Sequence, residues 1–91
     1  MTLNHKQEEL LQQLIGEIEA KFPETKFVKA YSGIEGENSV WLDFTKPHDE
    51  DRLIEVGEYA SERTTDILLD YGYHFVVLPV VQNGEHAALA L

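Results

Sequence analysis

Histidine and carboxylate side chains are the groups in this sequence whose types suit metal binding or acid–base chemistry. The histidines are His5, His48, His74 and His86, and no two lie four residues apart, as ligands on one helix face would. The segment HDED, residues 48–51, suggests either a loose divalent-ion site or acids favoured at a helix start, and we favour the second. The chain has no cysteine, which excludes a thiolate zinc site and a cysteine nucleophile. We predict no metal, no cofactor and no catalytic residue.

A second chemical feature is a line of acidic residues between positions 51 and 70. Steps of four, three, four, four and four residues place them along one side of a helix. Like charges at this spacing repel each other by about 0.2–0.5 kcal/mol per pair, and Arg52 and Arg63 offset only part of that cost. A solvated helix surface is the simple alternative. We predict that the line binds a cationic surface of another protein through Asp51, Glu55, Glu58, Glu62, Asp66 and Asp70.

Two glycines, Gly33 and Gly36, lie in the segment SGIEGEN. A phosphate cradle needs converging backbone N–H groups, usually with a lysine or a helix N-terminus. This segment instead holds Glu35 and Glu37 and leads into a predicted strand. The letters GIEG also resemble the G-x-x-G loop of KH domains, but that loop joins two helices. We predict a hairpin turn in which glycine permits positive φ.

Composition narrows the class of protein and of partner. Ninety-one residues, 43% of them hydrophobic, suit a single domain spanning residues 1–91. The net charge of −10 disfavours nucleic acid, including a KH-like function, and anionic membrane surfaces. No apolar run approaches the roughly 20 residues that span a bilayer. We therefore expect a soluble cytoplasmic protein with no nucleic-acid or membrane partner.

Helical periodicity predicts two main helices. The first begins after Asn4, which can form a capping box with Gln7, and ends before Pro23. The second begins near Pro47, capped by Asp49 or Thr45, and ends at Gly72. Apolar and small residues of the first helix recur at helical spacing at Leu10, Leu11, Leu14, Ile15, Ile18 and Phe22. The corresponding stripe of the second helix is Leu53, Gly57, Ala60, Thr64, Ile67, Leu68 and Tyr71.

Three strands complete the pattern. Residues 26–31 and 39–44 form a predicted hairpin, and the second of them alternates, with Val40, Leu42 and Phe44 on one face. Trp41 lies on the other face, either as core beneath a second layer of helices, which we favour, or as a candidate exposed anchor for a partner. The apolar run of residues 73–82 predicts a strand that is interior to the sheet. Asn83-Gly84 signals a hairpin, and residues 85–91 fit either a last strand or a helix.

These elements predict one α+β domain of order α-β-β-α-β(-β), with a mixed three- or four-stranded sheet and two main helices. The order resembles the minimal nucleotidyltransferase fold, over about 75 residues by pattern. Residues 10–33 resemble the family's first helix, strand and Gly-Ser turn, and VWLDF resembles the strand that carries its Asp-x-Asp pair. Residues 53–81 are similar to its second helix and next strand.

The resemblance implies two metal ions held by three carboxylates. The catalytic residues do not carry over, because the turn reads Ser32-Gly33 and Asp43 is the one acid that matches the pair. We therefore predict a non-catalytic acidic interaction module whose scaffold resembles a degenerate member of this family. The alternative is a divergent nucleotidyltransferase-like enzyme completed by a partner chain.

Overall fold

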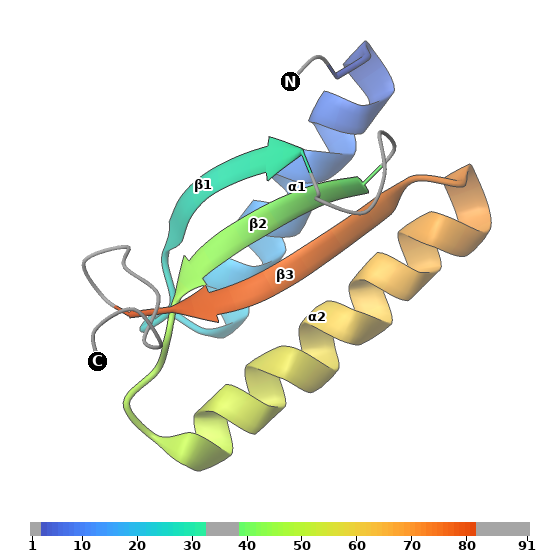
Figure 1. The fold of residues 1–91 in the computed structure, drawn as a ribbon. Helices are drawn as coiled ribbons and strands as arrows, with labels where there is room; N and C mark the ends of the chain where they lie inside the picture. The colour runs from blue at the N-terminus through green and yellow to red at the C-terminus, as the bar shows by residue number, and fades with distance from the viewer. Residues whose placement is uncertain (1–2, 33–38, 82–91) are drawn as a thin grey trace.

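The computed structural model describes residues 3–32 and 39–81, which form two helices and three strands (Figure 1). Gly33, Gly36 and residues 82–91 lie outside the described residues, so the predicted turn and the predicted last element are not observed. The order is α1 (His5–Lys21), β1 (Phe27–Ser32), β2 (Ser39–Thr45), α2 (Glu50–Tyr71) and β3 (His74–Val80). This is the α-β-β-α-β order and the α+β class expected from the sequence.

Capping interactions within a few residues fix the start of both helices and the end of α2. Asn4 Oδ1 accepts from the Gln7 N–H at 2.7 Å, and Gln7 Oε1 accepts from the Asn4 N–H at 3.0 Å, which completes the predicted capping box. Of the two candidate caps of α2, Asp49 is the one used, since its Oδ1 accepts from the Asp51 N–H at 2.9 Å. Gly72 ends α2 in the left-handed region with φ 79°, a conformation that favours glycine.

The three strands form a mixed sheet of order β1-β2-β3. β1 and β2 are antiparallel, as the predicted hairpin requires, with Tyr31 opposite Trp41 and Ala30 opposite Leu42. The register of this pair shifts between Phe27 and Lys29, which marks a bulge in β1. β2 and β3 are parallel, because α2 carries the chain from the end of β2 back to its beginning.

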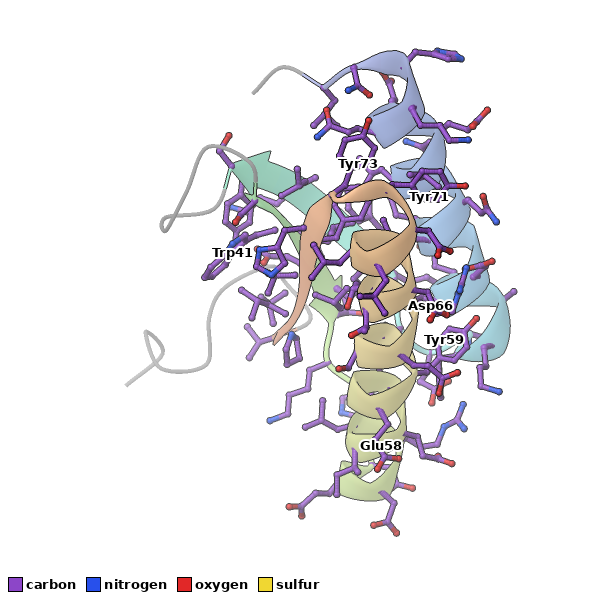
Figure 2. The ribbon with its side chains drawn as sticks, turned by 90° about the vertical axis from the view of Figure 1, so that its right-hand side faces the viewer. Trp41, Glu58, Tyr59, Asp66, Tyr71 and Tyr73 are labelled. Carbon is purple, nitrogen blue, oxygen red and sulfur yellow. The ribbon has the colours of Figure 1, made fainter. Side chains whose placement is uncertain are left out.

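Both helices lie on the same side of the sheet, so the domain has two layers (Figures 1 and 2). The core lies between the layers, and Val40, Leu42 and Phe44 form its central row, with exposed fractions of 3%, 0% and 1%. The helices and β3 complete it with Leu10, Leu11, Leu14, Ile15, Ile18, Ala60, Ile67 and Phe75. No helix in the described part of the chain is long and apolar enough to cross a membrane.

Among the described residues, strand order and burial differ from what the sequence predicted. β2, and not β3, is the central strand of the described sheet, because β3 pairs only with β2. Burial along β3 is mixed: Phe75 and Val80 are buried, and the three residues between Phe75 and Pro79 are half-buried. Trp41 points away from α1 and α2 and is partly buried, so no helix of the described residues covers it (Figure 2).

The buried stripe of α2 also differs from the predicted one. Val56, Ala60 and Ile67 are buried, whereas Gly57, Leu68 and Tyr71 are exposed. One side of α2 faces the sheet and the adjoining side faces α1, so the helix is turned relative to the predicted stripe. The rotation leaves Gly57 and Leu68 at the border between α2 and β3.

Hydrogen exchange is expected to be slowest in β2. Its backbone pairs with strands on both sides, so exchange of its amides requires opening of the whole sheet. The backbone N–H groups of β3 that point away from β2 should exchange faster than those that point toward it. Exchange measured residue by residue by NMR checks this order, and β3 amides slower than those of Leu42 and Phe44 would contradict it.

Candidate functional site

The acidic surface of α2 consists of the six acidic residues predicted from the sequence. All six are exposed, and Figure 2 shows Glu58 and Asp66 on the side of α2 turned away from the sheet. The helix carries seven acids and two arginines in all. The structure therefore places the predicted residues together on one helix surface, as their spacing required: Asp51, Glu55, Glu58, Glu62, Asp66 and Asp70.

The two arginines of α2 are shared between the acidic surface and two glutamates, Glu17 in α1 and Glu24 just after it. Arg63 donates to Glu17 of α1 at 2.9 Å and to Asp66 at 3.0 Å. Arg52 donates to Glu24 at 2.7 Å and to Glu55 at 3.2 Å. Each guanidinium thus contacts two carboxylates, and each group of three keeps a net negative charge.

The hydrogen bond between Arg52 and Glu24 shifts the pKa of both side chains. The guanidinium of Arg52 donates to the Glu24 carboxylate and holds the pKa of Glu24 below its usual value. The same contact raises the pKa of Arg52. Both groups stay ionised near neutral pH, so the bridges persist there. Asp51, Glu58, Glu62 and Asp70 form no salt bridge with a described residue.

A groove runs between α2 and the outer edge of β3, beside the acidic surface. We call it the α2–β3 groove, and its lining residues on α2 are mostly small. Gly57, Ser61 and Thr65 line both this groove and a shallower hollow that reaches Glu58, Glu62 and Asp66. The groove and the acidic surface therefore form one continuous area. The groove is lined by Gly57, Ala60, Ser61, Thr64, Thr65, Leu68 and the β3 residues His74 to Val77.

The face of the sheet opposite the helices carries an aromatic and polar cluster. The Tyr31 hydroxyl donates to Asp43 Oδ1 at 2.9 Å, and the Tyr31 and Trp41 rings lie 6.4 Å apart. Asp43 is 0% exposed, and its Oδ2 has no hydrogen-bond partner among the described residues. Burial raises the pKa of Tyr31, and the hydrogen bond to Asp43 adds to that rise. Tyr31 therefore stays neutral and holds the buried carboxylate.

This face offers little for the chemistry that the family resemblance implies. Within residues 3–32 and 39–81, no group of three His, Asp or Glu side chains is placed to hold a metal ion. Ser39 Oγ and His74 Nδ1 lie 3.1 Å apart on neighbouring strands. No described acid forms a hydrogen bond with His74, so the pair lacks the third group that orients a catalytic histidine.

Sequence reasoning found the acidic surface but missed the contacts made across the fold. The alternation of residues 39–44 placed Asp43 and Trp41 on one face, but the Tyr31–Asp43 bond depends on the hairpin register, which the structure shows. The sequence carried no signal for the α2–β3 groove. The groove depends on the rotation of α2 about its own axis and on which strand lies at the edge of the described sheet.

Comparison of the chain with protein-family models, with curated proteins and with solved structures found no match.

Proposed function

We propose that this protein is a non-catalytic interaction module whose acidic surface on α2 binds a positively charged surface of another protein. The observation that carries the proposal is the charge left uncompensated on α2. Both arginines of the helix are already shared with Glu17 and Glu24, and four acids of the surface have no described ionic partner.

The energy of the isolated helix supports this interpretation. Neighbouring acids along the surface repel each other, and lysines interleaved with them would relieve that repulsion at no cost to packing. A basic partner converts the repulsion into attraction and accelerates association. Each exposed charge pair adds less than about 1 kcal/mol, so binding depends on the whole surface and weakens as salt is added.

A pair of variants with equal charge tests the proposal with a decalysine peptide as the probe. Glu58→Lys/Glu62→Lys reverses two acids of the acidic surface that form no described ionic bridge. Glu8→Lys/Glu9→Lys makes the same change of net charge on the exposed surface of α1. We expect the first variant to weaken decalysine binding about tenfold more than the second, because two favourable contacts become repulsive.

Amide chemical shifts measured during the titration locate and quantify the binding. The expected shifts are saturable, cluster on α2 and diminish between low and physiological salt. Equal losses of affinity in the two variants would show that the peptide responds only to net charge, and the proposed surface would then be wrong. Circular dichroism should confirm that both variants remain folded, since all four positions are exposed.

A further inference from the structure

The two edges of the sheet differ in how well they are protected against pairing with another strand. β1 has a bulge between Phe27 and Lys29 and carries a charged lysine, two features that block edge pairing. β3, with the sequence HFVVLPV, has no bulge and no acidic or basic residue other than His74, and Pro79 near its end is its one protective feature. Among the described residues, no strand covers its outer edge.

The backbone groups at this edge can be assigned. Lys46 N–H donates to Val80 O at 2.6 Å, so the Val80 backbone points toward the β2 side. Backbone groups of successive residues point to opposite sides of a strand, so those of Phe75, Val77 and Pro79 point outward. Pro79 fits this assignment, because proline is tolerated where its missing N–H would face away from the sheet. Two N–H and three C=O groups are thus presented along the edge.

We infer that β3 pairs through this edge with an extended basic segment of a partner protein, which lies in the α2–β3 groove as an added strand. This inference rests on the proposed function, since the acidic surface selects the charge of the partner. The small side chains of Gly57, Ser61 and Thr65 leave room for a neighbouring strand beneath α2. Strand addition of this kind takes affinity from main-chain hydrogen bonds and specificity from alternate side chains.

The two faces of the added strand meet different surroundings. Its helix-side residues approach the hollow that Gly57, Ser61 and Thr65 share with Glu58, Glu62 and Asp66, which suits lysine or arginine. The alternate residues of the added strand lie on the opposite face of the sheet, beside Val76 and Leu78. Both of these side chains are half-buried, so apolar partner residues suit this face. The partner segment therefore alternates basic and apolar residues. A second copy of this chain fits poorly, because each copy carries a net charge of −10 and would oppose acid to acid.

The probe is an eight-residue peptide of alternating lysine and valine, compared with the same peptide N-methylated on the amides of one edge. The two carry equal charge, but the second cannot donate along that edge. We expect the unmethylated peptide to bind about tenfold more tightly and to slow hydrogen exchange at Phe75 and Val77. Equal affinities would overturn the inference, and so would slow exchange at both amides in the free protein, which would mean that the edge is already occupied.

Two variants of α2 supply matched controls for the groove. Ser61→Tyr places a ring in the groove, whereas Leu69→Tyr places one at a position that is 77% exposed and lines neither hollow. The first should weaken binding of the alternating peptide about tenfold and the second should leave it unchanged. Unchanged binding to both would overturn the inference.

The charge variants separate this inference from the proposed function. If Glu58→Lys/Glu62→Lys weakens binding more than Glu8→Lys/Glu9→Lys while N-methylation has no effect, the acidic surface stands and the strand addition is wrong. If N-methylation weakens binding while the two charge variants are equal, the edge does not select a basic partner, and both proposals are wrong.

Discussion

Replacing Phe44 with alanine is expected to remove about 3–5 kcal/mol from the free energy of unfolding. Phe44 is 1% exposed on the central strand, and its ring packs edge to face against Phe27 with centroids 5.7 Å apart. The truncated side chain leaves a cavity between the sheet and the helices, which a close-packed core cannot fill without moving both layers. A domain of this size has about 5–14 kcal/mol of stability, so the variant should be marginally folded.

Leu69→Ala is the matched control, since it also truncates a large apolar side chain but at a position that is 77% exposed. Its cost should stay within about 0.5 kcal/mol of zero, as is usual for surface positions. Urea unfolding followed by circular dichroism gives both values. A cost for Phe44→Ala below about 1 kcal/mol would contradict the core described here, which makes Phe44 part of its central row.

Replacing Tyr31 with phenylalanine is expected to cost about 2–3 kcal/mol, although it removes only a hydroxyl group. That hydroxyl donates to Asp43 Oδ1 at 2.9 Å, and Asp43 Oδ2 has no partner among the described residues. The variant therefore leaves a fully buried carboxylate without any described donor. Leaving a buried polar group without a hydrogen bond costs more than the net contribution of the bond itself.

A double-mutant cycle with Asp43→Ala separates the bond from the packing of the ring. Once the Asp43 side chain is truncated, Tyr31→Phe should cost less than about 0.5 kcal/mol, because no buried acceptor is left without a donor. The coupling energy between the two positions is the measured quantity. Equal costs of Tyr31→Phe in the two backgrounds would mean that the hydrogen bond does not hold Asp43.

The same pair predicts how stability depends on pH. Burial raises the pKa of Tyr31 above its ordinary value of 10.0, and the bond to Asp43 raises it further. The stability that neutral Tyr31 contributes is therefore complete below pH 10.0 and is lost as the pH rises through the higher pKa of the folded protein. Between these two pH values the wild-type protein should lose stability more steeply than Tyr31→Phe, which has no hydroxyl to ionise.

Local chemistry was sufficient to predict the elements and their ends. Asn4 with Gln7, Asp49, and Gly72 act through contacts within a few residues of the chain, so their effects could be inferred without knowledge of the fold. The period of two in residues 39–44 likewise predicted that Val40, Leu42 and Phe44 share the core face. The exposure of the acidic surface followed from helical spacing and from the cost of burying charge.

The sequence did not decide which strand is central, because pairing partners are chosen by packing between distant segments. The apolar run of β3 predicted burial on both sides, yet the hydrophobic effect has no direction and does not distinguish an interior strand from an edge strand. The second face of β2 carries Asp43 and Trp41, and the sequence left open whether Trp41 lies in a core or is exposed. The central position of β2 and the hairpin register bury Asp43 completely and give it Tyr31 as a donor.

What the sequence by itself determined is therefore the set of elements, their amphipathic faces and the charge of α2. The tertiary structure alone decided the order of the strands, the turn of α2 about its axis and the contacts that depend on both. Arg63 and Glu17 are 46 residues apart, and no local pattern brings them to 2.9 Å. The groove beside β3 also depends on the tertiary structure, since it forms where α2 meets the edge strand of the described sheet.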